Sequence, residues 1–416
     1  MKGLRFPLKV LALAVVAGAF IATAPAYGAY KARVDAGTLK ITGDGASDKL
    51  ALAAGAADTV VLDVGEDGTA DFSFDRNTFN AIAVQAGGGD DEVRVLNSNA
   101  LAEEDITING GAGNDTLIGG AGAETFIGGA GDDFVDGNIG ADTAQLGGGA
   151  DTFQWDPGDG SDVVDGQGGN DVLEFNGSNI GESFDVSANG SRVRFARNVG
   201  SIVMDLNDIE RLNVHALGGA DNMVVNDLTG TGVKTVDADL NAGGGGGTDG
   251  AADTVTAVGT DGPDNVKVSA PGCFATVSGL SAQVLVEGAD SAQDNVNVAA
   301  LGGDDTITSG REVCGPEAIN VDGGAGNDVA TYKGTDVADT IGVARNGSEV
   351  STFADLSSRL DIAAVESLVV QGLGGNDLLA GQNGIGALTS LTLDGGDGDD
   401  DLRGGDGADL LLGGPG

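Results

Sequence analysis

Aromatic and basic residues are scarce in this chain. Aromatic residues make up 4% of its 416 residues, with a single Trp, which is too little bulk to fill several large compact cores. Lys and Arg total 20 against 64 Asp and Glu, so the net charge is 20 − 64 = −44. No cluster of basic residues able to hold phosphates is present, which argues against nucleic acid as a partner. So many carboxylates repel one another, and we expect bound cations to neutralise them.

Histidine and cysteine are scarcer still, and their scarcity excludes several kinds of catalytic site. The one histidine, His215, excludes the HExxH zinc motif, and no serine stands in a GxSxG motif. Cys273 and Cys314 are too few, even with His215, for an all-Cys/His zinc site, and they form either one disulfide or two free thiols. His215 lies between Val214 and Ala216 in an ordinary strand pattern. We therefore predict that the chain is not an enzyme.

Glycine, in contrast, contributes 75 residues, and much of it recurs at a fixed spacing. Residues 110–154 divide into five consecutive nonapeptides, and a further copy follows at 166–174. In every copy position four is Gly, position six is acidic and position eight is apolar. The copies read GGAGNDTLI, GGAGAETFI, GGAGDDFVD, GNIGADTAQ, LGGGADTFQ and GQGGNDVLE. A disordered acidic segment is the alternative, but disorder does not require an apolar residue at every ninth position.

This pattern resembles GGxGxDxUx, the repeat of the hemolysin-type, or RTX, calcium-binding proteins. The resemblance implies an all-β fold, a parallel β-roll or β-helix-like solenoid with calcium in its Gly- and Asp-rich turns. Two nonapeptides would complete one coil, each with a six-residue turn and a three-residue strand. The chemistry agrees, because glycine permits positive φ angles and close approach of carbonyls, and a carboxylate is a hard oxygen ligand. Position eight would point inward and form a narrow core.

The resemblance also implies which residues hold calcium. One carboxylate per turn cannot fill the about six to eight oxygen positions of calcium, so each ion would be shared between neighbouring coils, with carbonyls completing the shell. Glu124 is one methylene longer than Asp, and Ala123 and Ala141 stand where Asn or Asp is common, so weak or absent binding is expected in those turns. The predicted ligands are Gly111, Gly113, Asp115, Gly129, Gly131, Asp133, Asp142, Asp151, Asp171, Asp328, Asp400 and Asp409.

Related turns occur outside the nonapeptide block. Gly- and Asp-rich stretches at 87–91, 218–221, 302–305, 323–328 and 374–377 each lead into alternating apolar residues, which predicts a turn entering a strand. Taken singly, such a turn is weak evidence for a metal.

A second, looser unit also recurs. Its copies start at residues 177, 259 and 334, and the separations of 259 − 177 = 82 and 334 − 259 = 75 residues indicate a diverged solenoid repeat. With an earlier copy at 41–52, its acidic positions are Asp48, Glu182, Asp264 and Asp339.

The N-terminus has the pattern of an export signal. Three basic residues precede an apolar run from Val10 to about Thr23, and small residues suited to a peptidase follow. Ala24-Pro25-Ala26 and Ala26-Tyr27-Gly28 are both suitable cleavage sites, so we expect the mature chain to start between Tyr27 and Ala29. A membrane anchor is the alternative, but the run is short for a spanning helix.

These patterns together predict the organisation of the chain. We expect a signal peptide at 1–28, an N-terminal β-rich solenoid segment at 29–108, an RTX-type calcium β-roll at 109–175, diverged β-solenoid repeats at 176–394 and the start of a second RTX-type array at 395–416.

The expected function is that of a secreted calcium-binding protein, outside the cell or at its surface, whose repeats fold on binding calcium. Its role would be structural or adhesive, with a cell-surface or extracellular-matrix partner and no stable membrane insertion. An alternative is the non-catalytic, calcium-dependent portion of a larger secreted enzyme or toxin, because a repeat stops in mid-turn at Gly416. Polysaccharide processing on the solenoid surface is a third hypothesis.

Overall fold

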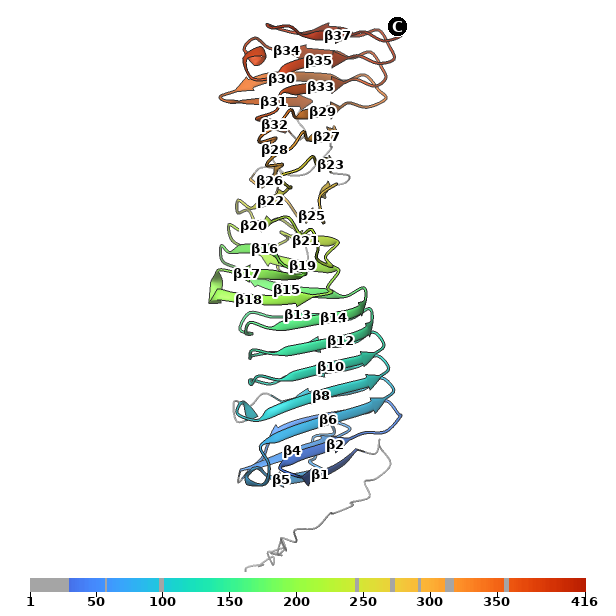
Figure 1. The fold of residues 1–416 in the computed structure, drawn as a ribbon, viewed down its shortest axis with the longest axis vertical. Coiled ribbons are helices and arrows are strands. Elements are labelled where there is room, and N and C mark those ends of the chain that lie inside the picture. Colours follow the sequence, from blue (N-terminus) through green and yellow to red (C-terminus); the bar gives the residue numbers. More distant parts are fainter. Residues whose placement is uncertain are drawn as a thin grey trace, which may run out of the picture.

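The computed structural model describes residues 30–56, 58–96, 101–243, 247–269, 274–290, 293–310, 318–354 and 359–416. The predicted signal peptide at 1–28 and both cysteines, Cys273 and Cys314, lie outside the described residues. The described chain winds into one elongated column with strands stacked along its long axis (Figure 1). It contains the short 3-10 helices η1 (Arg76–Thr78), η3 (Val199–Ser201) and η4 (Ile385–Ala387), and no α-helix within these ranges. The predicted all-β, largely parallel solenoid is confirmed.

Two long sheets form the walls of the column. Sheet A has 19 strands within the described ranges. In order along the column they are β1 (Lys31–Asp35), β2 (Thr38–Thr42), β6 (Ala81–Gly88), β8 (Asp105–Ala112), β10 (Thr125–Ala130), β12 (Thr143–Gly149), β14 (Val163–Gly169), β18 (Ile202–Asn207), β17 (Arg192–Arg197), β16 (Ser183–Asn189), β20 (Asn222–Val225), β22 (Thr254–Val258), β26 (Asn295–Ala299), β28 (Ala318–Asp322), β32 (Arg359–Ala363), β31 (Glu349–Ala354), β30 (Thr340–Asn346), β34 (Leu378–Gly381) and β36 (Asp401–Arg403).

Sheet B runs along the opposite side of the core. In the same direction its described strands are β5 (Phe72–Asp75), β4 (Thr59–Val64), β3 (Lys49–Ala54), β7 (Glu92–Val95), β9 (Thr116–Ile118), β11 (Phe134–Asp136), β13 (Thr152–Trp155), β15 (Val172–Ser178), β19 (Arg211–Leu217), β21 (Thr235–Asp239), β25 (Gln283–Glu287), β24 (Ala275–Ser278), β23 (Asn265–Ser269), β27 (Thr306–Gly310), β29 (Val329–Lys333), β33 (Ser367–Gln371), β35 (Ser390–Asp394) and β37 (Leu410–Leu412). Its end strands, β5 and β37, each pair on one side, so the sheet is open.

The nonapeptide period sets the register of the parallel strands. Thr107, Thr125 and Thr143 are direct neighbours in sheet A, so one coil takes 125 − 107 = 18 residues, or two nonapeptides. Position-eight side chains therefore stack inside the column, as Val135 does between Leu117 and Phe153, and each is at most 1% exposed. The prediction that position eight forms the core is confirmed. Because the side chains of successive coils are in register, a narrow core can be continuous.

Antiparallel units interrupt the parallel winding. β16, β17 and β18 form one such three-stranded unit in sheet A, β23 to β25 form one in sheet B, and β30 to β32 form another in sheet A. We call these hairpin units. Each begins directly after an acid of the recurring second unit, at Glu182, Asp264 and Asp339, and β3 to β5 follow Asp48 in the same way. The sequence revealed this repeat but not its antiparallel strands.

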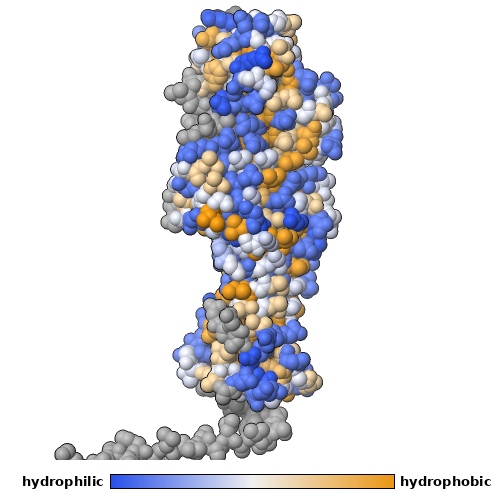
Figure 2. Space-filling view, turned by 90° about the vertical axis from the view of Figure 1, so that its left-hand side faces the viewer, coloured by the Kyte–Doolittle hydropathy of each residue, from blue (hydrophilic) through white to orange (hydrophobic). Residues whose placement is uncertain are grey.

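The outer surface has no single apolar face in the view shown. Figure 2 shows hydrophilic and hydrophobic residues intermixed over one side of the column. Of the most exposed large apolar side chains, Ile139, Ile180 and Val337 lie in separate turns, and Leu410 lies with Leu411 and Leu412 in the end strand β37. No helix within the described ranges is long and apolar enough to cross a membrane.

Candidate functional site

Each regular coil has two turns. We call them AB turns where the chain passes from sheet A to sheet B, and BA turns where it returns. In most of them a small residue at position one is followed by an acid at position six, whose carboxyl folds back beneath position one. A Cβ added to Gly110 would lie 2.3 Å from Asp115 Oδ2, and one added to Gly323 would lie 2.7 Å from Asp328 Oδ2. Glycine at position one therefore leaves the space that the carboxyl group occupies.

The position-six carboxyls form ladders along the column. Asp115 donates its backbone N–H to Oδ1 of Asp133, and Asp133 donates to Oδ1 of Asp151, both at 2.8 Å. Each acid thus joins two successive coils and satisfies a backbone N–H that lies in a buried turn. The AB ladders are Asp48, Asp91, Asp115, Asp133, Asp151, Asp171, Glu210 and then Asp264, Asp305, Asp328, Glu366; the BA ladders are Glu124, Asp142, Asp162, then Glu182, Asp221, Asp253, Asp294, then Asp339, Asp377, Asp400.

The second oxygen of many of these carboxyls is buried and accepts no hydrogen bond. This holds for Oδ2 of Asp48, Asp91, Asp115, Asp133, Asp142, Asp151, Asp171, Asp305, Asp328, Asp377 and Asp400. An unpaired buried acceptor costs about 1–3 kcal/mol, and more when it is charged. Burial accordingly raises the pKa of Asp133 to about 7, of Asp142 to about 8 and of Asp171 to about 6. These oxygens can stay ionised at neutral pH only if a cation faces them.

Backbone carbonyls of the preceding coil lie close against the glycines of these turns. Gly129 and Gly131 have φ angles of +123° and +130°. A Cβ added to either would lie 2.1 Å from the carbonyl oxygen of Gly111 or Gly113 in the coil before, so only glycine admits the approach. Within the described ranges no three His, Cys, Asp or Glu side chains converge on one point. An ion here would take most of its ligands from carbonyls, which fits calcium and not the softer thiolate- and imidazole-binding metals.

Position two distinguishes two kinds of turn among most of the ladder acids; Asp48 fits neither, because Asp44 at position two has no positive φ and Asp48 Oδ2 is still unpaired. Where position two has a positive φ, as at Gly111, Gly324 and Leu301, its N–H does not reach the acid of its own turn, and the position-six Oδ2 stays unpaired. Where position two is Thr260 or Thr335, φ is not positive and the N–H donates to the acid in the same turn, at 2.7 and 2.6 Å. The threonine hydroxyls bond to the same oxygens, at 3.3 and 2.9 Å. The first kind of turn suits a cation, and the second is closed by the protein's own donors.

The structure places the predicted ligands on both edges of the column. Four of the predicted acids, from Asp115 to Asp171, lie in one AB ladder, and Asp142 lies on the opposite edge. Asp328 belongs to the second AB ladder and Asp400 to the last BA ladder. Asp409 lies in the final AB turn, where a Cβ added to Gly404 would be 2.5 Å from its Oδ2. The four predicted glycines, Gly111, Gly113, Gly129 and Gly131, occupy positions two and four of adjoining turns.

Further acids share the same arrangement although the sequence did not single them out as ligands. Asp91, Asp305 and Asp377 each have a buried unpaired Oδ2. Their turns were recognised as isolated Gly- and Asp-rich stretches, but the stacking of turns distant in sequence was not visible. The second-unit acids Asp264 and Asp339 likewise each begin a ladder. The signal that could have found them is the spacing of five residues from a small residue to an acid.

Glu124 combines features of both kinds of turn. Its Oε2 accepts the N–H of Gly120 at 3.0 Å, and φ of Gly120 is not positive. Its Oε1 is buried without a hydrogen-bond partner. The longer side chain therefore reaches a donor that Asp does not reach in the neighbouring turns, and weak binding in this turn stays a prediction.

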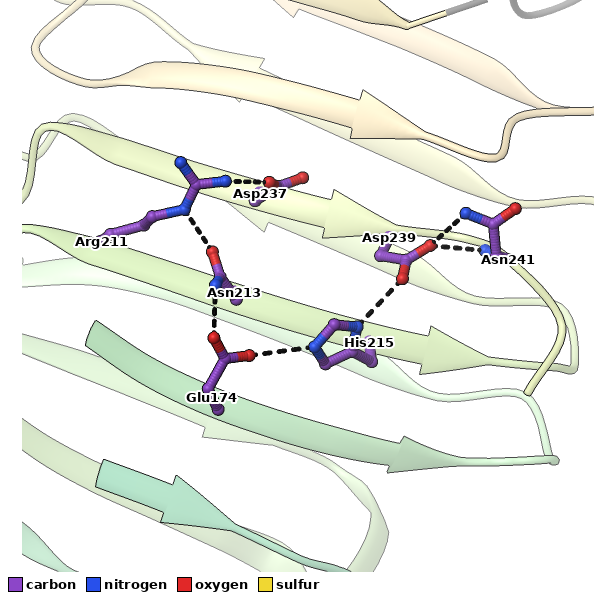
Figure 3. A network of polar contacts seen from close by, with 7 residues as sticks. All are labelled: Glu174, Arg211, Asn213, His215, Asp237, Asp239 and Asn241. Atoms are coloured by element: carbon purple, nitrogen blue, oxygen red, sulfur yellow. Dashed lines mark hydrogen bonds and ion pairs between the residues drawn. The ribbon is translucent and has the colours of Figure 1, made fainter. Parts of the chain in front are cut away.

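A different polar network covers the outer side of sheet B. Figure 3 shows His215 of β19 between Glu174 of β15 and Asp239 of β21, with both contacts at 3.0 Å. Asn213 and Arg211 extend the network along β19. The two carboxylates raise the pKa of His215 to about 10, so it is an imidazolium at neutral pH. A charged imidazole has no free lone pair, which argues against a general base here.

Comparison with known families identifies the repeat itself. A model of the RTX calcium-binding nonapeptide repeat matches four copies, at residues 107–135, 118–153, 158–179 and 392–416. No curated protein matches the chain. The matched segments contain the ladder acids from Asp115 to Asp171 together with Asp400 and Asp409, whereas residues 180–391 lie outside them. The chain is therefore built in part from RTX calcium-binding nonapeptide repeats.

Proposed function

We propose that this chain is an exported, non-catalytic scaffold whose turns fold when calcium binds. The observation that supports this most is the row of buried position-six oxygens that accept no hydrogen bond. Five of them, from Asp115 to Asp171, lie in the matched repeats. Unpaired, five such atoms would cost on the order of 5–15 kcal/mol, which equals the net stability of an ordinary domain. The coils at 107–153, which contain four of these five atoms, would therefore be marginal without a cation.

The residues that would hold the ion come from adjoining turns on one edge. At the first complete AB pair, these are the carboxyls of Asp115 and Asp133 together with carbonyls from Gly111, Gly113 and Gly129. Bound calcium supplies positive charge and several coordination positions, so that one ion neutralises two turns. Because the site needs two stacked coils, binding and folding would occur together.

Turn pairs outside the matched repeats have the same construction. Leu301 and Gly324 both have positive φ at position two, and their turns stack through Asp305 and Asp328. Both of these acids have a buried unpaired Oδ2. Asp377 and Asp400 form a similar pair further along. We extend the proposed calcium binding to these two pairs.

An extracellular location fits the expected affinity. Extracellular calcium modules bind at about 10⁻⁴ to 10⁻³ M, so such turns would stay empty of calcium at cytosolic concentrations and fill after export. The rigid column that results would serve a structural or adhesive role, with its −44 charge favouring solubility.

Circular dichroism of the chain, titrated with calcium and then with chelator, tests this proposal. We expect strand signal to rise with calcium, to fall with chelator and to respond far less to magnesium, which demands a smaller and more rigid shell. The double change Asp133→Ala, Asp142→Ala should lower the number of calcium ions bound in calorimetry. Equal strand signal in chelator, or unchanged stoichiometry in the double variant, would overturn it.

A further inference from the structure

The Glu182 turn differs from the turns with a positive φ at position two in what surrounds its carboxyl, and Ser178 at position two bonds to it as Thr260 and Thr335 do in their turns. A Cβ added to Gly177 would lie 2.6 Å from Glu182 Oε2, so the carboxyl occupies the usual place beneath position one. Its other neighbours differ, because β16 pairs on one side with β20 and on the other with the antiparallel strand β17. A complete pair of stacked turns is therefore present on one side of Glu182 only.

Arg197 at the end of β17 fills the other side. Its Nε donates to Glu182 Oε1 at 2.6 Å, and an Nη also contacts this oxygen. The side chains of Glu182 and Arg197 are 0% and 4% exposed, so the pair is buried. Ser178 donates its N–H to Oε2 at 2.8 Å and its hydroxyl to Oε1 at 2.9 Å, and it accepts from Arg197 at 3.1 Å. Both oxygens of Glu182 are thus satisfied by the protein, whereas Oδ2 of Asp133 is unpaired.

The core is also bulkest beside this pair. Trp155 stacks on Phe175 with ring centroids 4.1 Å apart, and Phe184 and Phe195 contact Phe175 in turn. The Arg197 guanidinium lies over the Trp155 ring, 5.2 Å from its centroid. Four large aromatic side chains bury far more area than the Leu, Val and Ala residues that fill most coils, so hydrophobic burial is strongest here.

We propose that Arg197 is a built-in cation that stands in for calcium at the Glu182 turn, so that the hairpin unit β16–β18 and its aromatic cluster fold without calcium. This inference rests on the proposed calcium-coupled folding of the nonapeptide turns. The hairpin unit then provides a preformed edge of sheet on which the turns on either side assemble when calcium binds. A buried charge pair with satisfied hydrogen bonds is stable once formed, whereas removing one partner leaves a buried charge alone.

Hydrogen exchange of the full chain in chelator tests the proposal, with the fluorescence of Trp155 as a second readout. Trp155 is the one Trp of the chain and packs against Phe175 and the Arg197 guanidinium, so its emission reports the aromatic cluster beside the hairpin unit. In the wild type we expect amides of β16, β17 and β18 to stay protected in chelator and Trp155 emission to stay at short wavelength. Amides of β10 and β12 should exchange rapidly until calcium is added.

Arg197→Met keeps the length of the side chain and removes its charge. Loss of one partner of a buried pair should lower amide protection in β17 about a hundredfold or more in chelator, and shift Trp155 emission to longer wavelength. Arg194→Met is the matched control, since Arg194 lies on the same strand but is exposed and pairs with the exposed Asp185. The double change Glu182→Gln, Arg197→Met removes both charges and should regain much of the protection.

Two results would overturn the proposal. One is rapid exchange of β16–β18 in wild-type protein in chelator, at the rate of β10. The other is equal behaviour of Arg197→Met and Arg194→Met. If calcium did not protect the amides of β10 and β12 from exchange, the proposed function would be contradicted instead. The experiment therefore distinguishes failure of this inference from failure of the proposed function.

Discussion

Asp133→Asn should change the stability of the chain in opposite directions with and without calcium. Asp133 is 2% exposed, its Oδ1 accepts the N–H of Asp115 at 2.8 Å and its Oδ2 is unpaired. Burial raises its pKa from 3.8 to about 7. The difference between these two pKa values means that ionised Asp133 destabilises the calcium-free fold by about 4 kcal/mol above pH 7. Because the folded pKa of this acid is raised, that penalty is absent below about pH 4 and grows as the pH rises to about 7.

Asparagine keeps the carbonyl acceptor for Asp115 and removes the charge. Its amide N–H groups bring back a desolvation cost of about 1–3 kcal/mol, so the variant should be about 1–3 kcal/mol more stable than wild type in chelator at pH 8. In calcium it should be less stable, since one ligand charge is lost. Denaturant unfolding followed by circular dichroism, in calcium and in chelator, measures both differences. Destabilisation of the same size in both conditions would refute the reasoning, because it would mean that Asp133 acts only through its hydrogen bond.

Three further predictions follow from the same turns and from the outer network. Gly131→Ala should lower the free energy of unfolding in calcium by about 2–4 kcal/mol, because φ is +130° and the new Cβ would meet the Gly113 carbonyl at 2.1 Å. Gly148→Ala is the control and should be near neutral, because its Cβ would lie 3.8 Å from its nearest neighbour. Equal melting temperatures for the two variants would contradict this prediction. Asp328→Asn should lower the number of calcium ions bound in calorimetry while leaving the amide protection of residues 107–153 unchanged, and undiminished stoichiometry would exclude a site there. The pKa of His215, measured by an NMR titration, should be about 10. The ion pairs of His215 should therefore stabilise the fold fully below about pH 6.5, and this stabilisation is lost as the pH rises through 10. A pKa of 6.5 or below would show that Glu174 and Asp239 do not stabilise the imidazolium.

The period of the sequence was enough to predict the coil and its core. Glycine at fixed positions and an apolar residue at position eight left few other ways to arrange residues 110–174, so Leu117, Val135 and Phe153 stack as expected. The sequence did not predict which turn of the next coil stacks on an isolated Gly- and Asp-rich turn. Asp91 and Asp115 are 24 residues apart and Asp48 and Asp91 are 43 apart, so their contact depends on how many residues each coil takes up.

The backbone conformation at position two of each turn also could not be predicted from the sequence. Leu301 and Leu373 adopt φ angles of +73° and +75°, which a leucine rarely does, because the stacked turns impose the conformation of the Gly at the same place in other copies. Thr260 and Thr335 avoid that conformation and use their hydroxyls instead. The residue type alone therefore does not reveal which turns leave an oxygen unpaired. Arg197 was hidden for a similar reason, since it comes from a strand whose antiparallel pairing no local pattern indicated.

The alternation of the hairpin units between the two sheets governs how such a chain can change its length. Between β18 and β26, sheet A contains β17, β16, β20 and β22, and between β19 and β27, sheet B contains β21, β25, β24 and β23, so both sheets grow by four strands. A hairpin unit in one sheet only would make that sheet longer by two strands, or about 10 Å, and would bend the column. Duplication or deletion in evolution should therefore preserve a straight column only when two units, one for each sheet, are gained or lost together.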